Sequence, residues 1–264
     1  MNSKPLEGKR ILITRMKSQA KRFAENIRGL GGEPVVIPLI SIVPPGNQQP
    51  MIEALRRIEQ FDWLVLTSQN GVKAFFSVLE KEKIPKEWLT HIKIAVVGTK
   101  TKQEVENFGF QAYLIPEQHF TAEALVDALL GKIKKGEHVL MARGNLARDL
   151  LPEKLNEHGL HVVDVVAYET KLNQEGQKEL IEEINNESLD VITFTSSSTV
   201  NHFVELLSKI DWKNKLKSTC LAAIGPITAN TMIKYEIPPD VVAKVNTTEG
   251  LLEEIIHYFR RKKE

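Results

Sequence analysis

The sequence predicts an α/β protein with two similar lobes, each a parallel sheet flanked by helices, joined by a two-stranded connection. Three observations carry this prediction. Short apolar segments alternate with helical patterns, the order of these segments repeats once, and two long extended segments interrupt the alternation. Alternation of this kind is typical of parallel sheets covered by helices on both faces. At 264 residues, the chain is long enough for two domains with buried cores.

The individual elements follow from the apolar spacing. The expected strands are the apolar segments 11–14, 63–67, 94–98 and 139–142. Each is followed by a segment with helical spacing, at 19–32, 72–81, 101–109 and 147–159. Glycines near the ends of these helices suit C-terminal caps, namely Gly29, Gly31, Gly109 and Gly159.

The chain contains an internal repeat. DVITFTSSSTV, which starts at Asp190, resembles DWLVLTSQNGV, which starts at Asp62, at an offset of 128 residues. The same offset relates GKRILITR to GEHVLMARG, and it falls to 127 where Gly98 aligns with Gly225. Because nearly one offset joins several separate segments, we interpret the repeat as an ancient duplication that gives two lobes.

Two extended segments define the expected hinge. Residues 35–43 and 163–171 are equivalent under the repeat and do not fit the simple alternation. We expect each to leave one lobe and enter the other. The first lobe is then 1–38 together with 172–264, and the second lobe is 39–171.

Hydroxyl groups gather where the expected strands end and helices begin. The most conspicuous case is the unbroken series from Thr195 to Thr199. The carboxyl ends of parallel strands face the ligand in open α/β sheets, and free N–H groups at helix N-termini favour anions. Two arginines at strand ends add cationic donors. The expected binding residues are Arg15, Thr67, Ser68, Gly98, Thr101, Arg143, Ser196, Ser197, Ser198, Gly225 and Thr228.

These residues also have a plainer interpretation. A Ser or Thr at such a junction is often only a helix cap. The two arginines can equally be solvated or paired with acidic neighbours such as Asp149. Five consecutive hydroxyls nevertheless exceed what capping requires, so we expect a ligand with several carboxylates or phosphates.

Composition excludes several other classes. A formal net charge of +1 argues against binding of nucleic acid or anionic membrane through the overall field. The single cysteine, Cys220, excludes an internal disulfide framework and a multi-cysteine metal site. We find no dinucleotide, P-loop or serine hydrolase motif, no metal-binding cluster, no signal peptide and no membrane span. We therefore expect a cytoplasmic, monomeric protein without metal.

Tyr168 is the candidate catalytic residue. It lies in VVAYET, within the second extended segment and close to the expected ligand. A phenol is protonated at neutral pH and can donate that proton. A tyrosine in a strand can also serve packing alone.

Taken together, the motifs resemble the uroporphyrinogen-III synthase family. The resemblance runs through nearly the whole chain: ILITR, TSQNGV, AVVGTKT, VLMARG, VVAYET, FTSSSTV, AAIGPITA and NTTEGLLEEI. It implies two α/β lobes with the substrate between them. It also implies the reaction, in which hydroxymethylbilane loses its terminal hydroxyl and cyclises with ring D inverted through a spiro intermediate, without metal or organic cofactor.

The resemblance further assigns roles to residues. The substrate carries acetate and propionate groups around a flexible chain of pyrroles, so many modest anion sites suit it. Tyr168 matches the family's cleft tyrosine and becomes the proton donor, whereas Thr101, Ser197 and Thr228 become contacts for carboxylate or hydroxyl groups. The implied partners are this small molecule and, transiently, hydroxymethylbilane synthase.

Two other functions use the same architecture. A cytoplasmic two-lobe binding protein or sensor would hold a polyanionic small molecule without converting it. A transferase that uses a nucleotide sugar would need a nucleotide-diphosphate site, which the sequence lacks.

Overall fold

The computed structural model describes residues 4–117 and 119–262. The extreme ends of the expected first lobe, 1–3 and 263–264, therefore lie outside the described residues. Contacts divide the chain into two compact units. Unit 1 runs up to Ser41 and resumes at Lys171, and unit 2 is Ile42–Thr170. The expected hinge role of the two extended segments stays a prediction.

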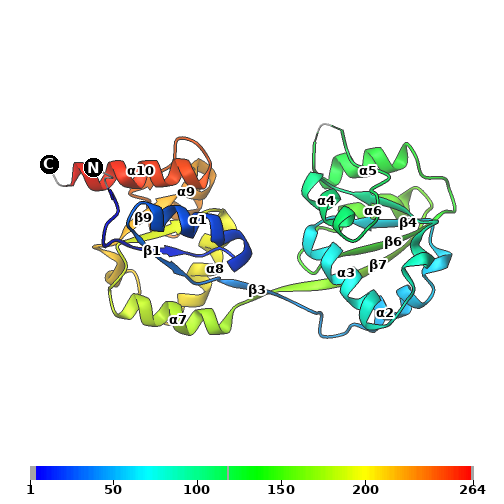
Figure 1. Ribbon diagram of the computed structural model, residues 1–264, viewed down its shortest axis with the longest axis horizontal. Coiled ribbons are helices and arrows are strands. Elements are labelled where there is room, and N and C mark those ends of the chain that lie inside the picture. The colour runs from blue at the N-terminus through cyan, green and yellow to red at the C-terminus, as the bar shows by residue number, and fades with distance from the viewer. Residues whose placement is uncertain (1–3, 118, 263–264) are drawn as a thin grey trace. The chain divides into compact units, whose positions relative to one another are not determined.

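Unit 1 is a five-stranded parallel sheet covered on both faces (Figure 1). Its strand order is β10 (Val241–Val242), β9 (Cys220–Ala223), β8 (Val191–Phe194), β1 (Arg10–Ile13) and β2 (Glu33–Val36). One face packs against α1 (Lys17–Gly29) and α10 (Thr248–Arg261). The other face packs against α7 (Gln174–Asn185), α8 (Ser197–Leu207) and α9 (Pro226–Lys234), and a short 3₁₀ helix lies at Asn214–Leu216.

Unit 2 has the same three-layer design. Its sheet order is β3 (Ile40–Val43), β7 (His161–Leu172), β6 (His138–Gly144), β4 (Trp63–Leu66) and β5 (Lys93–Val96). One face packs against α2 (Gln49–Arg56), α3 (Gln69–Lys81) and α4 (Thr99–Asn107). The opposite face packs against α5 (Ala122–Leu130) and α6 (Leu150–Glu157), and 3₁₀ helices lie at Ile58–Gln60 and Lys86–Leu89. The predicted α/β class is thereby confirmed.

Strand registers reproduce the sequence repeat and show how it is distributed. Leu12 of β1 pairs with Ile192 of β8 in unit 1, and Leu64 of β4 pairs with Leu140 of β6 in unit 2. Under the offset of 128 residues, Leu12 corresponds to Leu140 and Ile192 corresponds to Leu64. The strand pair of unit 1 and the strand pair of unit 2 are therefore equivalent. Each unit therefore combines the first strands of one copy with the later strands of the other.

The two extended segments differ from each other. Residues 163–171 lie within the single long strand β7, but the segment 35–43 is broken between β2 and β3. The break falls at Pro38, which has no N–H to donate to a neighbouring strand. Its carbonyl oxygen instead accepts a hydrogen bond from Asn173 Nδ2 at 2.9 Å. β2 consequently joins the sheet of unit 1, whereas β3 joins that of unit 2.

Three glycines occupy the helix C-terminal positions that the sequence predicts. Gly31, Gly109 and Gly159 follow helices with positive φ angles of 90°, 89° and 76°, a conformation that glycine adopts without steric cost. Within the described residues, no helix combines the length and the apolar character that crossing a bilayer requires.

Candidate functional site

The carboxyl edge of the unit 2 sheet brings Tyr168 and Ser68 together. β4 ends at Leu66, and Ser68 is the N-cap of α3, where its Oγ accepts a hydrogen bond from Gly71 N at 3.0 Å. Tyr168 comes from β7, and its hydroxyl oxygen lies 3.0 Å from the same Oγ. A strand end, a helix N-terminus and a phenol thus meet at one hydroxyl group.

Gly144 makes room for the phenol ring. The pairing of β6 with β7 shifts by one residue after Arg143, so that Gly144 lies opposite Tyr168. A Cβ on Gly144 would lie 2.6 Å from Tyr168 Cζ and 2.7 Å from its hydroxyl oxygen. Only glycine therefore allows the ring to lie this close to the β6 backbone. The sequence does not reveal this contact, because a β-bulge cannot be read from apolar spacing.

This arrangement is specific to unit 2. The repeat offset of 128 residues aligns Ser68 with Ser196, but it aligns Tyr168 with Ile40 and Gly144 with Met16. The hydroxyl at the helix N-terminus is thus common to both copies, whereas the phenol and the glycine beneath it occur in one copy. The two copies therefore differ in what surrounds this serine.

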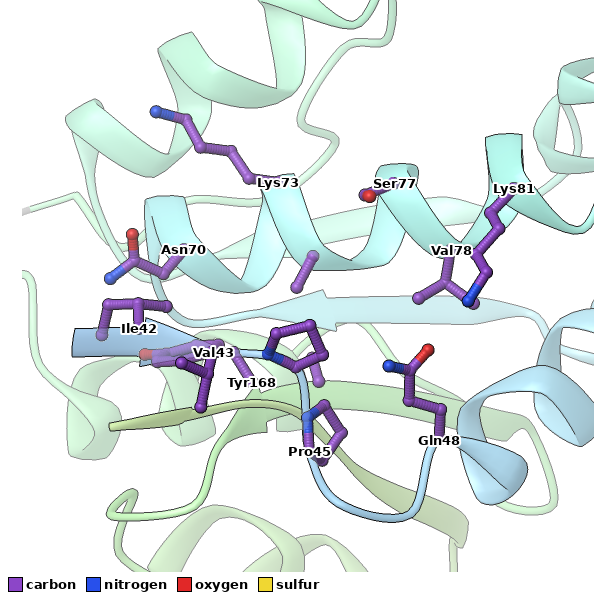
Figure 2. A pocket seen from close by; sticks show the side chains of 13 residues that line it. Ile42, Val43, Pro45, Gln48, Asn70, Lys73, Ser77, Val78, Lys81 and Tyr168 are labelled. Atoms are coloured by element: carbon purple, nitrogen blue, oxygen red, sulfur yellow. The ribbon is translucent and has the colours of Figure 1, made fainter. Parts of the chain in front are cut away.

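A half-open cavity of about 340 Å³ lies beside Tyr168, entirely within unit 2. Figure 2 shows α3 on one side, with β3 and the segment that follows it on the other. The lining residues are Ile42, Val43, Pro44, Pro45, Gln48, Asn70, Lys73, Ala74, Ser77, Val78, Lys81, Ala167 and Tyr168. Tyr168 is half-buried and is one of the residues that line this cavity.

The remaining predicted residues of unit 2 lie at nearby helix starts. Thr67 is half-buried and precedes the N-cap of α3. Gly98 is the N-cap of α4, and Thr101 lies buried in the first turn of that helix. A Cβ on Gly98 would lie 3.3 Å from Phe120 Cβ, so this aromatic side chain packs against the α4 N-terminus.

Arg143 is held by carboxylates of the protein itself. Its Nη2 lies 2.6 Å from Asp164 Oδ2 and 2.6 Å from Asp149 Oδ1, its Nε donates to Asp164 Oδ1, and its Nη1 donates to Ala147 O. Hydrogen bonding to Asp164 raises the pKa of the guanidinium, although burial opposes the shift. This geometry matches the ion-paired alternative, and a binding role for Arg143 stays a prediction.

In unit 1 the hydroxyl series caps α8 and contacts α9. Ser196 is the N-cap of α8 and forms a capping box with Thr199, and Ser196 Oγ lies 2.9 Å from Ser198 Oγ. Ser197 Oγ accepts a hydrogen bond of 2.8 Å from Thr231 Oγ1. Part of the series is therefore capping, and part of it ties α8 to α9. The sequence did not reveal Thr231, which lies on the next helix.

Three more predicted residues lie in unit 1. Gly225 is the N-cap of α9, where a Cβ would lie 2.5 Å from Asn246 Oδ1, and Thr228 is buried within the first turn. Arg15 donates a long hydrogen bond of 3.4 Å to Gln19 and forms no ion pair with another described residue. Unlike Arg143, Arg15 can therefore receive an external anion without losing a partner carboxylate.

Cys220 offers no reactive thiolate. It lies in β9 with 1% of its surface exposed, and burial raises the pKa of its thiol to about 12. Three or more His, Cys, Asp or Glu side chains do not gather in a metal-binding group anywhere in 4–117 or 119–262.

Comparisons with known proteins agree on one family. Residues 21–253 match the family model described as "Uroporphyrinogen-III synthase HemD". A uroporphyrinogen-III synthase of Synechococcus elongatus is 34% identical over 266 residues and covers 99% of each chain. A putative uroporphyrinogen-III synthase of Methanocaldococcus jannaschii is 31% identical and covers 93% of this chain and 97% of its own.

Solved structures show the same fold. A mutant uroporphyrinogen III synthase of Thermus thermophilus has a TM-score of 0.61 at 18% identity and covers 97% of this chain and all of its own. A uroporphyrinogen-III synthetase of Helicobacter pylori has a TM-score of 0.56 at 18% identity, with coverage of 95% and 99%.

Proposed function

The chain belongs to the uroporphyrinogen-III synthase family, and we propose that it cyclises hydroxymethylbilane with inversion of ring D and loss of water. It is an enzyme of tetrapyrrole biosynthesis, in the class of cyclising lyases. The observation that carries the proposed mechanism is the hydrogen bond between Tyr168 and Ser68 beside the unit 2 cavity.

Tyr168 is the proposed proton donor to the departing hydroxyl. Ser68 Oγ already accepts the N–H of Gly71, so the Ser68 hydroxyl hydrogen can be donated to the phenol oxygen. The phenol hydrogen is then available to the substrate. The C–O bond breaks with its electron pair on oxygen, and the proton from Tyr168 completes a water molecule. The lone pair of the pyrrole nitrogen stabilises the carbon left behind as an azafulvenium cation.

The surroundings of Tyr168 suit the charge that this step creates. After donation, the phenol oxygen carries negative charge while it still receives the Ser68 hydrogen bond. The N-terminal end of α3, with its free N–H groups, lies at the same place and stabilises negative charge. Cyclisation later releases a proton from ring D, and the phenolate can accept it and return to its starting state.

Selectivity for ring inversion comes from positioning. The substituted carbon of ring D must lie nearest the azafulvene carbon when the bond forms, and orientation of this kind can contribute strongly to rate. We propose that carboxylates of the substrate are held at several helix N-termini and by Arg15. The helix positions are Thr67, Ser68, Gly98, Thr101, Ser196, Ser197, Ser198, Gly225 and Thr228.

The setting of the reaction is also part of the proposal. We expect a cytoplasmic monomer that uses neither metal nor organic cofactor and contacts hydroxymethylbilane synthase transiently. Residues 35–43 and 163–171 act as the hinge between two lobes, 1–38 with 172–264 and 39–171. Family membership favours this enzyme over a binding protein or sensor that would hold the polyanion unchanged.

Analysis of product isomers tests the proposed function. Freshly made hydroxymethylbilane is supplied to the purified chain, and the oxidised porphyrins are separated by isomer. Predominantly type III product supports the function. Type I product alone, which forms without enzyme, would contradict it.

A further inference from the structure

We infer that the groove along α3 in unit 2 is a subsite for one pyrrole ring, in which Lys73 and Lys81 bind the acetate and propionate groups of that ring. The inference rests on the proposed function, because it assigns part of the substrate to a place on the chain. It extends that function to side chains that lie outside the helix N-termini and that the sequence did not single out.

The helix α3 presents two parallel rows of side chains to the groove. Lys73, Ser77 and Lys81 are exposed and lie four residues apart, so they share one face of the helix. A second row, formed by Asn70, Ala74 and Val78, is half-buried and forms the floor. Figure 2 shows Val78 and Lys81 directed toward the segment that follows β3, whereas the Lys73 side chain extends away from it.

The opposite wall is apolar and stiff. It consists of Ile42 and Val43 at the end of β3, followed by Pro44 and Pro45. The two proline rings fix their own φ angles, so this wall is formed before a ligand arrives. With Ala74 and Val78 on the floor, the groove offers apolar surface to both faces of a flat ring. Its volume of about 340 Å³ accommodates one substituted pyrrole.

The residues that line the groove carry net positive charge. Two lysines line it, and no acidic residue does. Lys81 forms no ion pair within the described part of the chain. Lys73 pairs with Glu104, with 3.7 Å between Nζ and Oε2. Because this separation exceeds ordinary hydrogen-bond length, a ligand carboxylate at hydrogen-bond distance can draw the ammonium group away from Glu104.

The spacing of the charges suits two carboxylates on one ring. Lys73 and Lys81 are separated by about 12 Å along the helix axis, because each residue rises about 1.5 Å. Their flexible stems allow both ammonium groups to turn inward over the floor. Ser77 lies between them and supplies a hydroxyl to either carboxylate. An apolar, flat ring with two anionic arms therefore complements the groove in shape and in charge.

The groove also orients its occupant toward the proposed acid. Tyr168 and Asn70 lie at one end, whereas Lys81 and Gln48 lie at the other (Figure 2). A pyrrole held between the lysines thus has its neighbouring ring at the Tyr168 end. This placement links substrate binding on α3 to the site of proton transfer within one unit.

The test compares two groove variants with a matched control in the same unit. Lys73→Gln and Lys81→Gln each remove one groove charge, and Lys86→Gln removes an exposed charge outside the groove. The binding probe is a monopyrrole that carries one acetate and one propionate on adjacent ring carbons, followed by NMR shifts of the protein amides. Thermal unfolding of each variant verifies that it is folded.

We expect each groove variant to weaken probe binding and to raise KM for hydroxymethylbilane by about five- to tenfold, with kcat within about twofold of wild type. Lys86→Gln should bind and turn over like wild type. The subsite would be overturned if the wild type yields type III product while both groove variants keep the wild-type probe affinity and KM. Lysine-dependent probe binding by a wild-type chain that yields only type I product would instead support the subsite and reject the proposed function.

Discussion

The phenol oxygen of Tyr168 lies 3.0 Å from Ser68 Oγ, and this Oγ also accepts the N–H of Gly71 in the first turn of α3. One serine therefore caps a helix and orients the candidate acid. Because both contacts use a single atom, changes at Ser68 should affect folding and chemistry together, whereas changes at ordinary caps should affect folding alone.

The first prediction separates these two roles of Ser68. Ser68→Ala should lower the free energy of unfolding by about 1 kcal/mol, because the cap is lost. It should also lower kcat by about tenfold, because the phenol loses its hydrogen-bond partner. The matched control is Thr121→Ala, which removes the cap of α5, where Oγ1 accepts from Ala124 N at 3.2 Å. Equal losses of kcat in both variants would show that Ser68 acts through stability only.

The second prediction concerns the space beneath the phenol ring. Gly144→Ala places a methyl group 2.6 Å from the present position of Tyr168 Cζ, so the ring must move. We expect kcat to fall by about tenfold or more, since misplacement of a catalytic group by about 1 Å is costly. Gly29→Ala is the control, because its added methyl would meet nothing within 4 Å. Wild-type turnover by Gly144→Ala would contradict the role assigned to this contact.

The third prediction contrasts the two arginines at the strand ends. Arg143→Gln should reduce the free energy of unfolding by about 2 kcal/mol, because Asp164, Asp149 and the carbonyl of Ala147 lose their donor. Arg15→Gln should leave stability within about 0.5 kcal/mol and raise KM instead, since Arg15 has no partner carboxylate among the described residues. Denaturant unfolding measures the free energy of unfolding, and steady-state kinetics measures KM. A loss of stability in Arg15→Gln with a raised KM only in Arg143→Gln would contradict this prediction.

The fourth prediction concerns acid stability of unit 1. Burial raises the pKa of Glu183, but hydrogen bonds from Arg10 and Ser188 outweigh it, so that the pKa lies below its ordinary value of 4.5. A carboxyl group with a lowered pKa stabilises the fold above the unfolded pKa, and this contribution is lost as pH falls through the folded pKa. Glu183→Gln should therefore destabilise the protein at pH 7, and the difference from wild type should shrink below about pH 4.5.

Calorimetric unfolding from pH 7 to pH 3 measures this difference directly. The control is Glu236→Gln, because Glu236 forms an exposed pair with Lys213 and such pairs contribute little. A difference between wild type and Glu183→Gln that does not change with pH would exclude the linkage.

Much of the fold follows from the sequence because it depends on periodic burial. Apolar segments such as 63–67 and 139–142 become central strands, and the repeat offset reappears as matched strand registers. Helix N-termini are predictable in kind, since Ser68 and Ser196 cap helices where the hydroxyls follow apolar strands. Their exact positions are not, because the helix expected at 72–81 begins at Gln69. These features are local, so one sequence reveals them.

The site is less predictable because it depends on contacts between distant segments. Tyr168 and Ser68 are 100 residues apart, and their contact needs the register shift that sets Gly144 opposite Tyr168. The ion pair between Arg143 and Asp164 likewise joins neighbouring strands. The break at Pro38 was not predicted, because the residues of segment 35–43 on both sides of it are mostly apolar and read as one extended strand.

Single-turnover conversion of hydroxymethylbilane by Tyr168→Phe tests the central claim most directly. The variant removes the donated proton and keeps the ring, and Tyr113→Phe serves as the control because that side chain is 59% exposed and packs on Trp63. We predict that formation of type III product by Tyr168→Phe slows by about 10²- to 10³-fold, while Tyr113→Phe matches wild type. Wild-type rates in Tyr168→Phe would contradict the assignment of Tyr168 as the acid.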